Sequence, residues 1–124
     1  MTDTIRGSCL WGASTFTSGG PLTTAFQCYC RDCQHVSGGG HLPQVGVAAK
    51  GFSSAGAVKA HRAKSDAGND LVFSFCGDCG SPLFKQTAIA PDQVFLYPGA
   101  LDHPPDVTFE HKVFEQGRQP WDTC

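Results

Sequence analysis

The sequence has few charged residues and lacks the long basic or apolar runs that indicate nucleic-acid or membrane proteins. Charged residues make up 16% of the 124 residues and the net charge is -2. Proteins that bind a phosphate backbone normally present a basic face, so we expect no nucleic-acid partner. No segment approaches the roughly 20 apolar residues of a membrane-spanning helix, and the N-terminus resembles no secretory signal. We therefore expect a soluble, cytoplasmic protein without a membrane partner.

Residues typical of long exposed helices are also scarce, since the chain has 1 methionine against 15 glycines and 8 prolines. This composition favours strands joined by turns, and we expect a mostly β fold with one domain over residues 1–124. A helical turn is predicted only at residues 31–36. Short apolar or alternating segments between turn-forming residues predict strands at residues 22–29, 42–49, 57–63, 71–75, 82–87, 93–97 and 107–114.

Cysteine is the residue that this sequence has in excess, with 7 in the chain. In a reducing compartment thiols stay free, and an odd total argues against complete disulfide pairing, so clustered cysteines indicate metal or redox chemistry. Zinc is the metal expected with such thiol groups. Six of the cysteines form three groups, which are Cys9 alone, Cys28-Tyr29-Cys30-Arg31-Asp32-Cys33, and Cys76-Gly77-Asp78-Cys79-Gly80.

The last group has the spacing of a zinc knuckle. A Cys-x-x-Cys turn can close to the roughly 3.8 Å that separates neighbouring sulfurs of tetrahedral zinc. Gly77 and Gly80 permit a positive φ and leave backbone N–H groups free to face the thiolates of Cys76 and Cys79. The flanking apolar segments place this turn between two paired strands. A reduced dithiol in an ordinary hairpin is the alternative.

The middle group places three thiols within six residues. Cys28 and Cys30 share one face of a strand because side-chain direction has period two, and Cys33 returns from the following turn. Three protein ligands leave one coordination position of zinc open, as in catalytic sites, and a thiol that entered it would lose its proton near neutral pH. The alternative is a closed four-thiolate site shared with Cys76 and Cys79.

The ordered series of these groups resembles the glutathione-dependent formaldehyde-activating enzyme family. The resemblance implies antiparallel sheets of an Mss4-like fold, a catalytic zinc at Cys28, Cys30 and Cys33, and a structural zinc that includes Cys9, Cys76 and Cys79. The matching segments span nearly the whole chain and are Gly7-Ser8-Cys9-Leu10, Cys28 to Cys33 with Ser37-Gly38, Cys76 to Phe84, Gly99 to Asp102, and His111 with Pro120-Trp121.

One residue departs from the family pattern. The structural zinc of the family takes an early Cys-x-Cys pair, and here Trp11 replaces the second cysteine of that pair. The indole nitrogen has no free lone pair to offer a metal. We expect the site still to hold zinc through its three remaining thiols. The open alternatives are a fourth ligand from water or histidine, weak zinc binding, and an empty site with Trp11 packed over it. Cys124 is expected to be a frayed free thiol.

The resemblance implies an enzyme of the carbon-sulfur lyase type that joins glutathione, or a related small thiol, and formaldehyde to S-hydroxymethylglutathione. Glutathione carries two carboxylates, so Arg31, Lys85 and Arg118 are candidates to bind it. His35 and His41 flank glycines 38–40 and are candidate proton carriers. The glycines themselves either admit a substrate backbone or form a flexible loop.

Two other function classes fit parts of the pattern. A non-catalytic, zinc-stabilised binding or glutathione-carrier module would use its cysteines only to fold, so Cys30→Ala would unfold it. A methionine sulfoxide reductase would need a reactive cysteine outside the metal groups, and only Cys124 is left for that role. His111 and Trp121 match the C-terminal family pattern, and we expect Trp121 to anchor the last strand.

Overall fold

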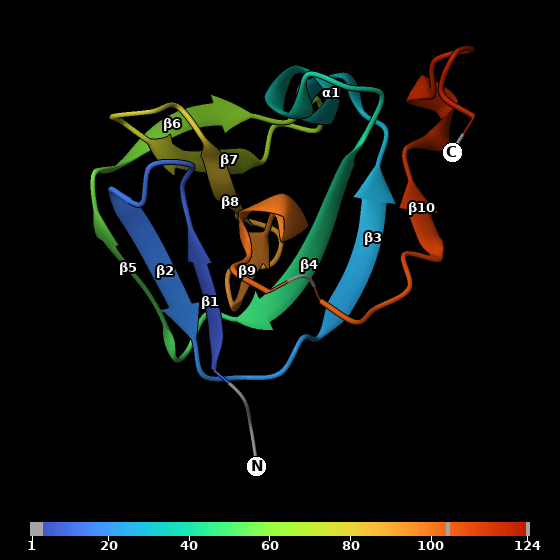
Figure 1. Cartoon of the computed structure of the whole chain (residues 1–124). Coiled ribbons are helices and arrows are strands. Elements are labelled where there is room, and N and C mark those ends of the chain that lie inside the picture. The colour runs from blue at the N-terminus through green and yellow to red at the C-terminus, as the bar shows by residue number, and fades with distance from the viewer. Residues whose placement is uncertain (1–3, 104, 124) are drawn as a thin grey trace.

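Two β-sheets and one α-helix make up most of the chain in the computed structural model, which describes residues 4–103 and 105–123 (Figure 1). The smaller sheet has the order β1-β2-β5 and consists of β1 (Ile5–Ser8), β2 (Ser14–Ser18) and β5 (Phe52–Gly56). The larger sheet has the order β10-β3-β4-β9-β8-β7-β6 and consists of β3 (Thr24–Cys28), β4 (Leu42–Ala48), β6 (Val58–Lys64), β7 (Asp70–Cys76), β8 (Pro82–Thr87), β9 (Gln93–Leu96) and β10 (His111–Val113). The helical elements are α1 (Arg31–Ser37) and the short 3-10 helices η1 (Pro98–Ala100) and η2 (Glu115–Gly117). The expectation of a mostly β fold with very little helix is confirmed.

The two sheets pack face to face around the main hydrophobic core. Phe16 of β2 lies edge-on to Phe84 of β8, with ring centroids 5.7 Å apart, and Phe52 of β5 meets the same ring at 4.8 Å. Burying one such side chain stabilises a fold by about 1.5–3 kcal/mol. Cys9 and Cys76 belong to this core, so one group of cysteines lies between the sheets.

A second, smaller apolar cluster lies on the outer face of the larger sheet. It contains Cys28, Cys33, Leu42 and Tyr97. Leu42 and the core residue Val45 are three positions apart on β4, and an odd separation on a strand points side chains to opposite faces. The two groups of cysteines therefore lie on different sides of the larger sheet.

The helix α1 begins and ends where the sequence supplies caps. Cys30 is its N-cap, and the Cys30 sulfur accepts a hydrogen bond from the backbone N–H of Cys33 at 3.3 Å. Gly38 ends the helix with φ 74, and its N–H donates to the carbonyl of Gln34. Figure 1 shows α1 beside the ends of β3 and β4. The predicted helical turn at residues 31–36 is confirmed.

Neighbouring strands pair antiparallel except at one edge, where β10 lies parallel to β3. Val113 pairs with Cys28, and the N–H of Tyr29 donates to the Val113 carbonyl at 3.0 Å. Residues 107–114 were expected to form one strand, but only residues 111–113 do, and Phe114 ends that strand with φ 56. The last strand thus pairs with the strand that carries the first thiol of the middle group.

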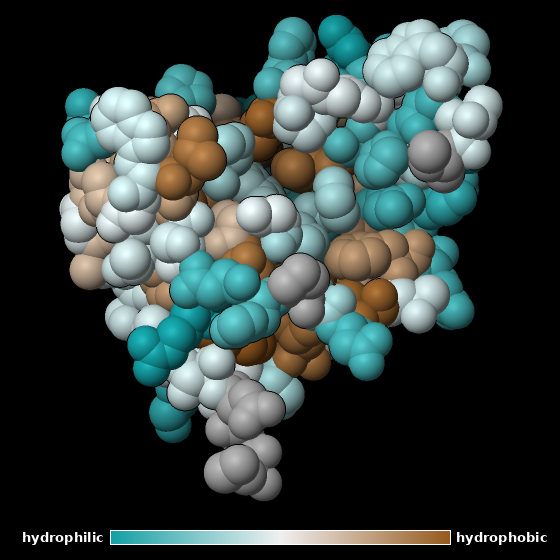
Figure 2. Space-filling model, in the orientation of Figure 1, coloured by the Kyte–Doolittle hydropathy of each residue, from teal (hydrophilic) through white to brown (hydrophobic). Residues whose placement is uncertain are grey.

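The face of the molecule seen in Figure 2 mixes hydrophilic and hydrophobic residues. The large apolar side chains that are exposed are Leu10, Trp11, Ile89, Phe114 and Trp121. None of the described helices is long and apolar enough to cross a membrane.

Candidate functional site

Six cysteines form two separate clusters of three. In each cluster the sulfur atoms all lie within 4.8 Å of one another, and the clusters are Cys28, Cys30 and Cys33, and Cys9, Cys76 and Cys79. We call them the outer cluster and the inner cluster. The separation excludes the alternative in which the middle group shares one closed site with Cys76 and Cys79. Each cluster has the donor set and spacing that suit a thiophilic metal such as zinc.

The outer cluster is built where β3 passes into α1. Cys28 ends the strand, Cys30 caps the helix in extended conformation, and Cys33 lies in the first helical turn. Cys28 and Cys33 are buried and Cys30 is half-buried. The Cys33 sulfur accepts a hydrogen bond from the Nε2 amide of Gln44 at 3.6 Å. The side chains therefore converge without any long-range loop.

Electrostatics in the outer cluster favours one thiolate and opposes more. Hydrogen bonds from Cys28 and Cys33 lower the pKa of the Cys30 thiol, and the positive charge of Lys85 lowers it further. Hydrogen bonds with Cys28 and Cys30, together with burial, raise the pKa of Cys33. Three thiolates cannot share this volume without a cation, because like charges and desolvation disfavour the ionised forms. The cluster thus fits a metal ion that supplies the missing positive charge.

Two buried polar residues beside the outer cluster were missed by sequence reasoning. Gln44 is 0% exposed and its Oε1 has no hydrogen-bond partner in the described part of the chain, and the same holds for the hydroxyl of Tyr97, which is 5% exposed. Burial and then the neighbouring Cys33 raise the pKa of Tyr97. The signal available in the sequence was a glutamine in the otherwise apolar segment of β4.

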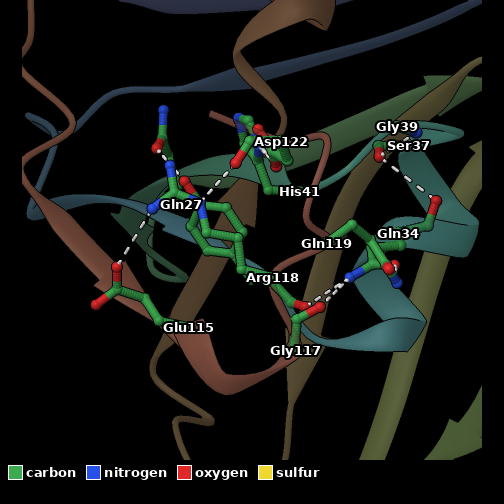
Figure 3. A network of polar contacts seen from close by, with 11 residues as sticks. Gln27, Gln34, Ser37, Gly39, His41, Glu115, Gly117, Arg118, Gln119 and Asp122 are labelled. Atoms are coloured by element: carbon green, nitrogen blue, oxygen red, sulfur yellow. Dashed lines mark hydrogen bonds and ion pairs between the residues drawn. The ribbon is translucent and has the colours of Figure 1, made fainter. Parts of the chain in front are cut away.

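The C-terminal segment supports the outer cluster from the side of α1 (Figure 3). The Nε2 amide of Gln34, the residue after Cys33, donates to the carbonyl oxygens of Tyr29 at 2.8 Å and Gly117 at 2.9 Å. Gln119 donates in turn to the Gln34 side-chain oxygen at 3.1 Å. Gln34 is buried, so these bonds hold the end of the chain against the residues between the thiols.

A second contact in Figure 3 joins the same segment to the loop after α1. The Nδ1 atom of His41 lies 2.7 Å from the Asp122 carboxylate, and Arg118 donates through Nε to the Asp122 carbonyl at 2.7 Å. The His41 ring packs against Tyr29, and the Arg118 guanidinium lies 5.2 Å from the Tyr29 ring centroid. A Cβ at Gly40 would overlap the Asp122 carboxylate, so this glycine provides space for the C-terminal segment.

The inner cluster has the expected knuckle between two paired strands. β7 ends at Cys76, β8 begins at Pro82, and Gly80 takes a positive φ of 81. Backbone N–H groups face two of the sulfurs, with Ser14 donating to Cys9 at 3.3 Å and Asp78 donating to Cys76 at 3.4 Å. Such N–H···S bonds are typical of sulfurs that carry negative charge.

A serine hydroxyl faces the third sulfur of the inner cluster. Ser81 Oγ lies 3.2 Å from the sulfur of Cys79 and accepts the N–H of Leu10 at 3.1 Å. The hydrogen bond from Ser81 lowers the pKa of Cys79 to about 6. The bonds at all three sulfurs suit thiolate ligands of a metal ion.

Trp11 does not close the inner cluster. Its side chain is 71% exposed, so the alternative in which the indole packs over the site as core is wrong. The backbone N–H of Trp11 faces the Cys79 sulfur. Within the described residues no fourth His, Cys, Asp or Glu completes the cluster, and Cys124 lies outside the described residues.

The three basic candidates for substrate binding lie in different surroundings. Arg31 is exposed and donates to the side chain of Gln34, and Arg118 lies over Tyr29 on the side of the C-terminal segment. The positive charge of Lys85 favours the thiolate forms of Cys30 and Cys33. Trp121 is 67% exposed, so the expectation that it anchors the last strand is wrong. The neighbouring Asp122 instead holds the C-terminal segment through its contact with His41.

A cavity of about 380 Å³ lies between α1 and the strands β6 and β7. Its walls include Val36 and Tyr97, which also pack against the outer cluster. The proton-carrier candidate His35 lines this cavity together with Asp32 and His61, whereas His41 is paired with Asp122. The outer cluster therefore has a cavity beside it that a small substrate could enter.

Comparison with known proteins agrees with this architecture. A crystal structure of a Rhodobacter sphaeroides protein superposes with a TM-score of 0.64 at 15% sequence identity, over 82% of this chain and 91% of that chain. This likeness shows a shared fold alone. No curated protein matches the sequence significantly. The sequence profile of the glutathione-dependent formaldehyde-activating enzyme family matches residues 4–117, which include all six clustered cysteines. The chain therefore belongs to the glutathione-dependent formaldehyde-activating enzyme family.

Proposed function

We propose that this protein is a zinc-dependent enzyme of the carbon-sulfur lyase type that joins glutathione, or a related small thiol, and formaldehyde to the S-hydroxymethyl thiol. Membership of the family supports the reaction class. The observation that carries the proposal is the outer cluster, where three thiols converge beside a cavity. Three protein ligands leave one coordination position of zinc open, and the cavity gives a small substrate a route to that position at the outer cluster.

Cys28, Cys30 and Cys33 would hold the catalytic zinc. When bound there, zinc supplies the positive charge that keeps three thiolates in a largely buried site and lowers the pKa of a substrate thiol at its open coordination position. Cys9, Cys76 and Cys79 would hold a second, structural zinc between the two sheets.

The chain's own residues prepare the outer cluster for this chemistry. The Gln44 amide donates to the Cys33 sulfur and the Cys33 N–H donates to the Cys30 sulfur, which fixes the direction of the sulfurs as outer contacts do in metal sites. Leu42 and Tyr97 pack against the buried thiols and exclude water from that side. The sulfurs therefore keep one arrangement before and after substrate binds.

The reaction itself needs positioning more than strong catalysis. Formaldehyde adds to the thiol so that a carbon-sulfur bond forms, the carbonyl π bond breaks, and the thiol proton ends on the product oxygen. No electrons enter or leave. Holding the thiol and the aldehyde together in a cavity beside the cluster raises their effective concentration, and this is the main contribution that we assign to the protein.

Exchange NMR tests the proposal, because it measures the interconversion of glutathione and S-hydroxymethylglutathione at equilibrium. The zinc-loaded protein is expected to speed the exchange above the protein-free rate, and Cys30→Ala is expected to remain folded by circular dichroism while losing this effect. Cys124→Ser, a cysteine substitution outside both clusters, is the matched control and should leave the rate unchanged. An exchange rate equal to the protein-free rate would contradict the enzyme, and unfolding of Cys30→Ala would favour the non-catalytic module.

A further inference from the structure

One row of side chains on the outer face of the larger sheet leads from its β6 edge towards the outer cluster. His61 pairs with Phe73, Phe73 with Lys85, and Lys85 with Phe95 across β6, β7, β8 and β9. Directly paired residues on neighbouring strands point to the same face of a sheet. These four side chains therefore share one face of the sheet.

The row continues on β4 to the thiols. Phe95 pairs with Gly46, and Gln44, two positions away on the same strand, points to the same face and bonds the Cys33 sulfur. His61 and Phe73 also line the cavity under α1. Lys85 thus stands between a residue of the cavity wall and the part of the sheet that contacts the outer cluster.

Lys85 is half-buried, whereas the other four lysines of the chain are exposed. Its ammonium lies 5.8 Å from the centroid of the Phe95 ring. No carboxylate of the residues that the structure describes lies within 4.0 Å of it, whereas the exposed Lys64 pairs with Asp70 at 2.7 Å. A half-buried ammonium without a counter-ion is costly, so the structure keeps a positive charge available on the side of the sheet that bears the thiols.

We infer that Lys85 binds a carboxylate of the thiol substrate, so that the enzyme selects thiols that carry negative charge. This inference rests on the proposed function and names the substrate class of that same site. A small thiol whose sulfur lies at the outer cluster would place its carboxylate over the Lys85 and Phe95 pair. Asp32 lines the helical wall of the cavity, and its negative charge would direct a substrate carboxylate away from α1 towards Lys85. The sign of the charges thus favours one orientation of the substrate.

The first experiment compares a charged thiol with a neutral one. The dissociation constants of glutathione and of its neutral-carboxyl diethyl ester are measured for the zinc-loaded protein by NMR titration. Lys85→Met keeps the length of the side chain over Phe95 and removes the charge. We expect it to weaken glutathione binding about tenfold and to change binding of the diester less than twofold. Lys85→Arg should restore most of the affinity for glutathione.

Lys50→Met is the matched control, because Lys50 is an exposed lysine in the turn between β4 and β5 and should leave both affinities unchanged. A kinetic readout adds to the binding data, since Lys85→Met should raise the KM for glutathione while kcat stays within twofold. Equal weakening of glutathione and diester by Lys85→Met, or no weakening of either, would overturn the role of Lys85 and leave the proposed function intact. Failure of the wild-type protein to bind any thiol would overturn both.

Discussion

The indole of Trp11 points into solvent while the backbone N–H of the same residue faces the Cys79 sulfur. Residue 11 is thus next to the inner cluster, and only its side chain is unsuited to the metal. The departure from the family pattern at residue 11 was evident from the sequence, because the Cys-x-Cys spacing of the family places a cysteine at this position. That the ring is exposed was not readable, because an isolated tryptophan is as compatible with a core as with a surface.

Restoring a thiol at this position is expected to close the inner cluster. Trp11→Cys should slow the transfer of the zinc proposed for the inner cluster to a chromogenic chelator by tenfold or more, because a fourth thiolate adds a bond to the metal. Leu10→Cys is the matched control, since the neighbouring residue is 85% exposed. Equal slowing in both variants would show that an added cysteine acts without completing the site.

Gly117 illustrates how one missing Cβ supports the outer cluster. A Cβ at this position would lie 2.6 Å from the carbonyl oxygen of Tyr29, whereas a Cβ at Gly99 would meet no atom within 4 Å. Gly117→Ala should therefore destabilise the fold by about 1–3 kcal/mol through overpacking and weaken metal binding at the outer cluster. Urea unfolding and cobalt titration check this, with Gly99→Ala as the control. Unfolding midpoints that agree for the two variants would contradict the close approach.

Strands could be predicted from the sequence where their core-facing side chains are apolar and their solvent-facing side chains are polar. The strands with apolar core residues, such as β4 with Val45 and Val47, were predicted from the sequence, but β1, β2 and β5 were not. In β2 two of the three core-facing residues are Ser14 and Ser18, each 0% exposed. Buried serines give no apolar alternation, so the pattern of the small sheet is invisible to a rule based on hydrophobicity.

In the candidate site, residues that are close in the sequence could be predicted, and residues brought together by strand pairing could not. The thiols were identified because their spacing in the sequence alone brings them together. Gln44 and Tyr97 were not identified, because they reach the outer cluster through strand pairing and no motif marks them. Sequence reasoning offered three basic residues for the substrate with equal weight, and the register of β8 against β7 and β9 distinguishes Lys85 from the others.

The C-terminal segment is expected to depend in part on the hydrogen bond between His41 and Asp122. Asp122→Ala removes the partner of His41 and should release residues 115–122, at a cost of about 1–3 kcal/mol for a partly buried hydrogen bond to a carboxylate. Hydrogen exchange should then rise in β10 and at the Tyr29 amide, which donates to Val113. Glu115→Ala is the control, because Glu115 is 4.0 Å from Arg118 and its side chain is 55% exposed. Unchanged exchange in Asp122→Ala would contradict an anchoring role.

In the molecule as a whole, the two cysteine clusters lie in different parts of the structure. The inner cluster lies in the core that joins the sheets, and the outer cluster lies in a smaller apolar group on one face. Loss of a buried ligand in the main core should therefore affect folding more than loss of a ligand in the outer group.

Paired substitutions measure this difference. In zinc-loaded protein, Cys76→Ala should lower the free energy of unfolding by about 2–4 kcal/mol, and Cys30→Ala by less than about half of that. Chemical denaturation followed by fluorescence gives both values, and zinc per chain measured on the same samples should fall from two to one in each variant. A zinc content near one in the wild-type protein that survives Cys76→Ala would contradict occupancy of the inner cluster.

The parallel pairing of β10 with β3 also determines when the outer cluster becomes complete during synthesis. All six clustered cysteines have emerged from the ribosome once residue 79 has. The support for the outer cluster comes from partners such as Gln34 and Gln119, which are 85 positions apart. A nascent chain from which residues 111–119 have not yet emerged therefore carries the three thiols of the outer cluster without these contacts. Full preorganisation of the proposed catalytic site therefore follows the emergence of Gln119 and not that of the thiols alone.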